Sequence, residues 1–392
     1  MTVPRCKLFL PVLLFIFFFS LYFSNQRRLA DTTVMSVNSI FYADTSETVE
    51  IMTYPTFNMD ATKHLLFSVT TYPLVAALSA CLGMARDNAA LAVVSLAGAF
   101  NAAFSFYVIG LFTKEKAAAL VFAVLFGILF SNLVLSSIPE TYVFSNMMVL
   151  FYAFFAKKYS ERPGYLRGFS LAAVTALAPL YNPPLLLLLI ATGYIMFSGP
   201  DISLALRLFQ VNALVVLCVF IGANLLAHPN YLDICARIIQ KNASVANFFN
   251  TGDILNVILS FVLYAVVSPL RSPRPTFWIN DALNYLSFPA KLPLTLAYLC
   301  FLGFSLKNLL NRGNPVVKGL ALWAVSMGIF YFYFNPGEAM LYSSQTLLPV
   351  LLVLVLRFEK THFRYKYHAA VLFSFVLFVN NYSSLISFAS MK

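Results

Sequence analysis

Long apolar runs separated by short polar intervals restrict what this chain can fold into. Residues 8–24, 88–112 and 369–388 are three such runs, and each is close to the roughly 20 apolar residues that cross a bilayer as a helix. Of the 392 residues, 60% are hydrophobic and 10% are charged, whereas soluble domains carry about 25% charged residues. We therefore expect an all-α polytopic integral membrane protein with roughly ten to twelve transmembrane helices and no soluble domain.

Further runs complete this set of expected helices. They cover residues 65–85, 117–138, 143–156, 169–197, 210–228, 255–269, 292–306, 317–334 and 342–356. Asn182-Pro183-Pro184 interrupts 169–197, so a kinked helix and two short helices both fit that run. Residues 271–291 mix charged and aromatic side chains, which is typical of a segment at the membrane surface.

The positive charge indicates an orientation but leaves a conflict. The net charge of +11 sits in short clusters between apolar runs, and the strongest cluster is Lys157–Arg167. The positive-inside rule makes this cluster and the N-terminus cytoplasmic and favours contact with anionic lipid over nucleic acid. Strict alternation of the expected spans puts the cluster outside instead. Either one stretch between residues 65 and 138 is a half-span or hairpin, or the helix count is off by one.

Residues 25–64 form the longest polar interval, expected as an extracytoplasmic loop with short interfacial helices. If its middle is helical, a spacing of three puts Asp44 and Glu47 on one face. A carboxylate there could accept a proton from a hydroxyl group or bind sugar hydroxyls or a metal. It could equally just solvate the loop. The interval holds five of the chain's fifteen acidic residues, Asp31, Asp44, Glu47, Glu50 and Asp60, and ends in Lys63-His64.

A second polar segment, Ser136–Asn146, contains Glu140 and Tyr142 in otherwise apolar text. An acid at such a position is energetically costly and is a functional candidate. Because Pro139 precedes it, Glu140 is expected at a helix start, where the helix dipole favours a negative charge. The segment therefore predicts either a capping carboxylate or one that binds substrate.

A third polar segment surrounds Glu338, the only charged residue between Lys318 and Arg357. The Pro-Gly pair before Glu338 indicates a turn or helix break. We expect Glu338 at the membrane rim, facing other polar groups or capping the helix that follows.

These segments, in this order, resemble the GT-C superfamily of polytopic glycosyltransferases, which includes the protein O-mannosyltransferases and the aminoarabinose transferases. Asp44-Thr-Ser-Glu47 is similar to the acidic motif of the family's first extracytoplasmic loop. Lys63-His64-Leu-Leu-Phe is similar to the segment that closes this loop. The family's proline pair is absent there, and Tyr72-Pro73 comes later.

The two later segments extend the resemblance. Ser136–Asn146 is similar to the family's polar break between its fourth and fifth spans, and Glu338–Gln345 resembles a late polar segment of some members. The resemblance covers mainly residues 1–210, which it implies are a catalytic membrane module including loop 25–64. Residues 211–392 are then variable C-terminal transmembrane helices.

The resemblance implies an inverting sugar transfer from a polyprenyl-phosphate donor to a hydroxyl of an envelope glycan, lipid or protein. Asp44 would be the general base, and the leaving lipid phosphate would need cations or amide donors. Arginine suits bidentate phosphate binding, but the two arginines could also anchor the chain at the membrane surface. The implied substrate-binding residues are Glu47, Asp60, Lys63, His64, Glu140, Tyr142, Arg271, Arg274 and Glu338.

Two other functions stay open. A transporter or flippase for a lipid-linked oligosaccharide would also use proline-broken helices and a lone intramembrane acid, although the chain shows no internal repeat. An O-antigen polymerase usually carries its large loop late, whereas the first loop is the longest here. No ligand spacing demands a metal, so a divalent cation is left open, and the five scattered cysteines indicate no disulfide framework. A bacterial inner membrane is the expected location.

Overall fold

The computed structural model is helical throughout the part of the chain that it describes. This part comprises residues 6–30, 45–54, 64–199, 201–226, 251–268, 291–312, 314–334 and 339–389. Seven of its helices are long and apolar enough to cross a membrane. An all-α, multi-pass membrane protein is thereby confirmed, whereas a total of ten to twelve spans stays a prediction.

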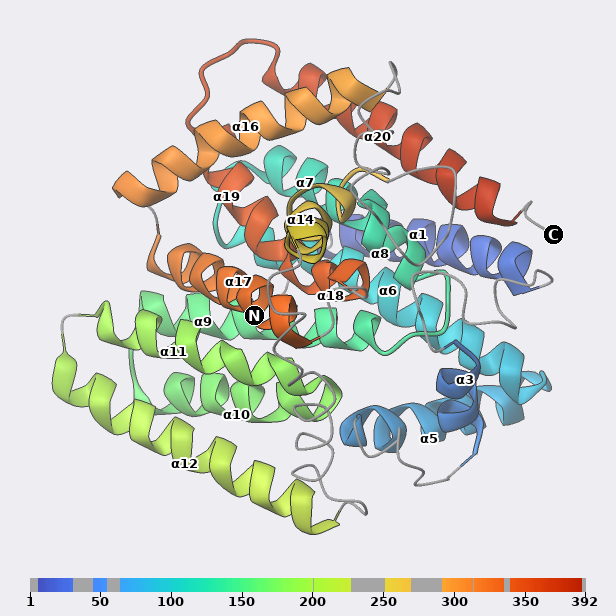
Figure 1. Cartoon of the computed structure of the whole chain (residues 1–392), viewed down its shortest axis with the longest axis horizontal. Helices are drawn as coiled ribbons and strands as arrows, with labels where there is room; N and C mark the ends of the chain where they lie inside the picture. The colour runs from blue at the N-terminus through green and yellow to red at the C-terminus, as the bar shows by residue number, and fades with distance from the viewer. Residues whose placement is uncertain are drawn as a thin grey trace.

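The helices form one bundle with a buried centre (Figure 1). In chain order they are α1 (Cys6–Ala30), α3 (Thr45–Thr53), α5 (Leu65–Leu82), α6 (Arg86–Gly110), α7 (Lys116–Ile128), α8 (Phe130–Leu135), α9 (Tyr142–Glu161), α10 (Tyr165–Tyr181), the 3₁₀ helix η1 (Pro183–Leu187), α11 (Leu188–Phe197), α12 (Ile202–Leu226), α14 (Thr251–Leu259), the π-helix η3 (Ser260–Tyr264), α16 (Lys291–Arg312), α17 (Pro315–Phe334), α18 (Ala339–Ser343), the 3₁₀ helix η5 (Ser344–Thr346), α19 (Leu347–Glu359) and α20 (Lys366–Ala389).

Helix α6 lies in the centre of the N-terminal half because its small side chains let neighbouring helices approach closely. Its sequence is rich in alanine, glycine and serine, the residue types that favour close helix contacts in membranes. A Cβ atom added at Gly98 would overlap the side chain of Ser136. The Tyr22 hydroxyl of α1 donates a hydrogen bond to the carbonyl of Gly127 at 2.7 Å, so α1 is fixed against α7 as well as α6.

Packing around α6 places the N-terminus and the strongest basic cluster relative to each other. Ser95 donates to Gln26 at 2.7 Å, whereas Gly98 lies against Tyr22, so α1 and α6 run antiparallel. The Lys157 ammonium lies 5.5 Å from the centre of the Phe112 ring, just beyond the end of α6. The start of α1 and the basic cluster Lys157–Arg167 are therefore at the same end of the bundle, which the positive-inside rule makes cytoplasmic.

Helix α5 begins and ends at the opposite, extracytoplasmic end. At its start, the His64 ring bonds the carbonyl of Tyr181, which ends α10. At its end the chain turns into α6, whose first residue, Arg86, donates to the carbonyl of Thr53 at 3.0 Å. By length and composition α5 is one of the seven candidate spans, so the expectation that 65–85 crosses the membrane stays a prediction. If α5 is instead the half-span or hairpin that the sequence allows between residues 65 and 138, removing it from the count restores the alternation.

Several expected helices are broken where polar or proline residues interrupt them. The run 117–138 becomes α7 and α8, joined at Leu129, whose backbone is extended (φ −57°, ψ 141°). The run 169–197 becomes α10 and α11, separated at Asn182 and linked through η1. Of the two alternatives for that run, two shorter helices are correct, because proline cannot continue the hydrogen-bonding ladder of a helix.

Candidate functional site

Two polar segments that the sequence singled out meet in the bundle, although they lie about 200 residues apart. The rings of Tyr142 and Tyr342 are in edge-to-face contact with their centres 5.2 Å apart. The Ser344 hydroxyl donates to Asn146 Oδ1 at 3.4 Å across a sequence separation of 198 residues. Helix α9 therefore lies against η5, and the segment Ser136–Asn146 and the segment Ala339–Gln345 form one site.

Glu140 is the buried acid of this site. Its residue is 3% exposed, and Oε2 accepts the backbone N–H of Thr141 at 2.9 Å. Helix α9 begins at Tyr142 with Thr141 as its N-cap, so Glu140 lies just before the helix rather than in its first turn. The predicted helix start is thus shifted by two residues, and the carboxylate contacts the N-terminal end of α9.

Amide side chains surround this end of α9. Asn146 donates to Asn132 Oδ1 at 3.0 Å, and Asn132 donates to the carbonyl of Phe126 at 2.7 Å. Asn101 donates to the carbonyl of Val143 at 2.6 Å. The hydrogen bonds of these three amides hold α6, α8 and α9 in register inside an apolar environment, where an unmade hydrogen bond is costly.

Gln345 differs from these three amides, of which Asn101 keeps only its Oδ1 unpaired among the described residues. It is 1% exposed, and within the described part of the chain neither atom of its amide has a hydrogen-bond partner. Leaving a buried polar group unpaired costs about 1–3 kcal/mol. The Gln345 amide lies beside Ser344, and both its N–H donor and its oxygen acceptor are unused among the described residues. It is therefore suited to bind a polar ligand.

Aromatic rings line the same region. Tyr331 stacks on Tyr342 with ring centres 3.8 Å apart and planes 11° apart. Phe261 lies 6.0 Å from Tyr331 and belongs to the π-helix η3, which packs against α18. Single π-turns inside helices are frequent at functional sites. The buried Ser260 hydroxyl in the same turn has no hydrogen-bond partner among the described residues.

A second hydrogen-bond network joins this region to the C-terminal helices. Asn381 of α20 donates to the carbonyls of Ile128 at 3.0 Å and Val266 at 2.9 Å. Its Oδ1 accepts the backbone N–H of Ser268 at 2.8 Å. These bonds satisfy backbone groups that have no helical hydrogen-bond partner at the α7–α8 break and at the end of η3.

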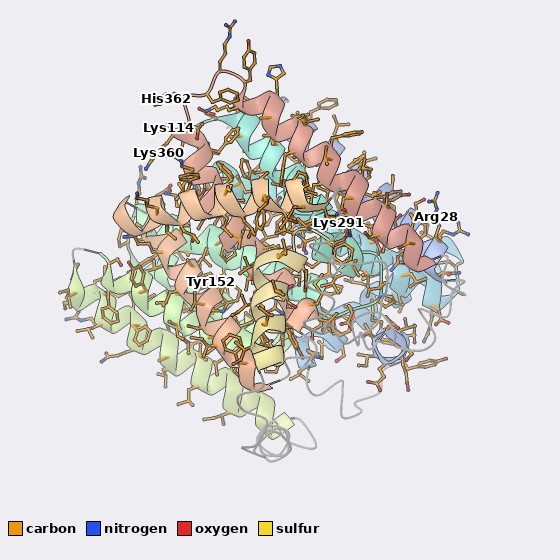
Figure 2. All side chains as sticks on the ribbon, turned by 45° about the horizontal axis from the view of Figure 1, so that its top comes forward. Arg28, Lys114, Tyr152, Lys291, Lys360 and His362 are labelled. Carbon is orange, nitrogen blue, oxygen red and sulfur yellow. The ribbon has the colours of Figure 1, made fainter. Side chains whose placement is uncertain are left out.

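Lys291 adds a cation to this second network. Its ammonium donates to the carbonyl of Ser268 at 3.2 Å and to the Ser268 hydroxyl at 3.3 Å. Figure 2 shows Lys291 between the helices, whereas Arg28 lies at the rim of the bundle. Arg28 donates to the hydroxyl of Tyr382 at 3.0 Å. Lys291 begins α16, and Arg28 lies in the last turn of α1. Both cations are therefore at the extracytoplasmic end of the bundle.

The closing segment of the first loop also approaches the start of α9. The ring of Phe144 is stacked on Tyr181 at 6.4 Å and meets Phe67 edge to face at 5.2 Å. His64 Nδ1 lies 2.6 Å from the carbonyl of Tyr181. Because a carbonyl only accepts, Nδ1 must carry the proton in this bond.

Glu47 lies farther along the loop. It is half-buried and lies in the first turn of α3, which begins at Thr45 and packs on α5 and α6. The structure therefore brings Glu140, Tyr142 and His64 into one region through the residues described above, and it places Glu47 at the same end of the bundle.

Six predicted site residues lie outside the described residues, so their roles stay predictions. They are Asp44, Asp60, Lys63, Arg271, Arg274 and Glu338. Sequence reasoning missed three residues, Asn132, Lys291 and Asn381, and it included Gln345 only as the end of a polar segment. The signal was present for the asparagines and the glutamine, since an amide inside an apolar run must find a partner in the bundle. Within the described ranges, no group of three or more His, Cys, Asp or Glu side chains gathers as metal ligands would.

Comparison with known proteins adds no family to this picture. No protein-family model matches the chain, and no curated protein sequence matches it. The fold and the site thus define a class, an all-α multi-pass membrane protein with a buried polar site where broken helices meet. The likeness to GT-C glycosyltransferases depends on the sequence motifs described above.

Proposed function

We propose that this protein is a GT-C-type membrane glycosyltransferase. It moves a sugar from a polyprenyl-phosphate donor to a hydroxyl of an envelope glycan, lipid or protein, in a bacterial inner membrane. The observation that carries the proposal is the buried group formed by Glu140, Gln345 and the Tyr142–Tyr342 pair. A carboxylate and an amide match the hydroxyl groups of a sugar, and aromatic faces match its C–H faces.

In this proposal the chemistry is divided between the loop and the buried site. Asp44, which directly precedes α3, removes the proton from the acceptor hydroxyl, and the resulting attack inverts the anomeric carbon. Glu140 and Gln345 hold the sugar. Negative charge develops on the leaving phosphate, and Lys291 joins His64 and the predicted Lys63, Arg271 and Arg274 as a group able to stabilise it.

The test is made in intact cells with Asp44→Asn and Glu140→Gln. Loss of a general base lowers a rate by about 10²–10⁴-fold, so Asp44→Asn should remove one hexose-sized increment from envelope glycans measured by mass spectrometry. Glu161→Gln is the matched control, because that carboxylate lies at the cytoplasmic end and is paired with Lys157. Protein abundance is measured beside each variant. Unchanged glycans in both site variants would contradict the proposal.

A second candidate is a transporter of lipid-linked oligosaccharide. The α7–α8 break, the α10–η1 break and the π-helix favour it, because transporters bind substrate between discontinuous helices. Purified protein in detergent separates the two functions. A transferase forms a new glycosidic bond there, whereas a transporter needs two compartments and changes no bond. An O-antigen polymerase would give a ladder of repeating units instead of a single added sugar.

A further inference from the structure

The cytoplasmic end of α20 and its neighbours carry an excess of positive charge. Residues 114–116 and 357–368 contain six lysine or arginine residues and two glutamates. The α7 N-terminus and the loop between α19 and α20 bring these two segments together, since Glu359 accepts the backbone N–H of Lys114 at 3.0 Å. Figure 2 shows Lys114, Lys360 and His362 at the same end of the molecule, with their side chains directed away from the bundle.

Both glutamates are already engaged. Glu115 binds the ammonium of Lys366 at 3.0 Å and accepts a hydrogen bond from the Tyr367 hydroxyl. Glu359 is held by Lys114 through the backbone. In the part of the chain that the structure describes, no ion pair joins Lys360 or Arg364 to an acid, and both side chains are exposed. Their charge is thus available to a ligand.

The first turns of α20, which follow these cations in the sequence, carry a shallow, wide-open hollow on one face. An open hollow of about 500 Å³ is lined by Tyr367, His368, Val371, Leu372 and Phe375. The three apolar residues at its lower end are each more than half exposed. With a rise of about 1.5 Å per residue, the hollow runs about 12 Å along the helix, which is most of the roughly 15 Å thickness of one leaflet's hydrocarbon.

We propose that this hollow and the cations above it bind one anionic phospholipid of the cytoplasmic leaflet. The lipid phosphate lies against Lys360 and Arg364, and an acyl chain follows Val371, Leu372 and Phe375. The charge and the hollow require an occupant that is anionic at one end and apolar over the next 12 Å or so, which describes an amphiphile. An acidic protein segment would match the cations but would leave the hollow at bilayer depth uncovered. This site is independent of the proposed sugar transfer.

The experiment measures lipid retention by native mass spectrometry on the full-length protein in a neutral detergent. The added lipids are phosphatidylglycerol and phosphatidylcholine with identical acyl chains. Each lysine or arginine near an anionic surface contributes enough attraction that removing two should weaken retention of phosphatidylglycerol roughly 30-fold. The double variant Lys360→Gln/Arg364→Gln tests this value. Lys157→Gln/Lys158→Gln is the matched control, because it removes the same charge from lysines that already pair with Glu161.

A third variant separates a lipid from other sources of phosphate. Leu372→Trp fills the hollow and leaves the cations in place, so it should weaken binding of phosphatidylglycerol but not of inorganic phosphate. Selective retention of phosphatidylglycerol that is lost in the first double variant and kept in the control supports the site. Equal retention of both lipids by the wild-type protein overturns it without any variant. Equal losses of phosphatidylglycerol retention in both double variants overturn the site as well. So does unchanged phosphatidylglycerol retention in Leu372→Trp. Capture of an acidic peptide instead of lipid would also overturn it.

Discussion

Two consecutive spans near the C-terminal end differ sharply in their surroundings although both are strongly apolar. In an 18-residue apolar window of the span Ala339–Glu359, made of α18, η5 and α19, 89% of the residues are buried, whereas in the corresponding window of Lys366–Ser387 in α20 the share is 22%. Figure 1 shows α18 and α19 within the bundle and α20 along its outer edge. The inner span contains a 3₁₀ turn and the site residues Ser344 and Gln345, whereas α20 is one unbroken helix.

The difference teaches that apolar composition identifies a membrane span but not its neighbours. Lipid chains are as apolar as leucine, so a helix gains no hydrophobic energy by leaving lipid for protein. What distinguishes the inner span is close packing and buried polar contacts. A broken backbone is tolerated there because protein groups, and not lipid, surround it.

The largest expected difference between the two spans comes from removing an aromatic ring. Tyr342→Ala removes a side chain that stacks on Tyr331 and contacts Tyr142, and truncating a large buried aromatic residue costs about 3–5 kcal/mol. Phe375→Ala on α20 is the control. Phe375 is 63% exposed, and lipid fills the space that it leaves. Unfolding by sodium dodecyl sulfate measures the stability of both variants. Equal losses of stability would show that Tyr342 is not part of a packed interior.

A smaller difference is expected from adding a methyl group to a helix. Gly98→Ala places a carbon atom against Ser136, and overpacking a core costs about 1–3 kcal/mol. Gly303→Ala on the outer helix α16 meets nothing within 4 Å and should leave stability unchanged or raise it slightly. The same unfolding assay applies. A neutral Gly98→Ala would mean that α6 and the segment before α9 are not in contact.

Removing one hydrogen-bonding side chain should have a similar or smaller effect. Asn146→Ala leaves Asn132 Oδ1 and the Ser344 hydroxyl without this partner, at a cost of about 1–2 kcal/mol. Ser374→Ala on α20 is the matched control, because the Ser374 hydroxyl bonds only the carbonyl of Ala370 in its own helix. The comparison fails if thermal unfolding midpoints of both variants fall equally.

The smallest effect concerns the contact between α7 and α20. The hydrogen bond from Tyr367, followed by that from Lys366, holds the pKa of Glu115 below its ordinary value. A carboxyl group with a lowered folded-state pKa stabilises the fold above its unfolded pKa, about 4.3, and this stabilisation is lost as the pH falls through the folded pKa.

Glu115→Gln therefore lowers stability near pH 7 by less than about 1 kcal/mol, because the pair is partly exposed. The difference from wild type should shrink as thermal unfolding is repeated at successively lower pH values. A difference that is the same at pH 7 and pH 3 would show that Glu115 acts through packing rather than through its charge.

The sequence predicted the helical membrane class and singled out two polar segments, but it did not predict that these segments meet. Glu140 and Tyr142 were recognisable because polar residues in apolar text are costly. Their contact with Ser344 and Tyr342 was not, because helix neighbours across 198 residues are not encoded in local periodicity. The sequence also left open which stretch between residues 65 and 138, if any, does not cross, since a helix at one end of the bundle and a crossing helix have the same apolar composition. Lys291 was hidden inside a segment that was interpreted as a surface anchor.

The hydrogen bonds of Asn381 have a consequence for how the protein is made. Its amide satisfies the carbonyl of Ile128, which the ribosome has synthesised 253 residues earlier. Until α20 enters the membrane, the break between α7 and α8 lacks this donor, and lipid cannot supply a replacement. Biogenesis must therefore keep a partly assembled bundle sheltered from lipid, by insertion machinery or by retained water, and completion of the centre waits for one of the last helices to insert.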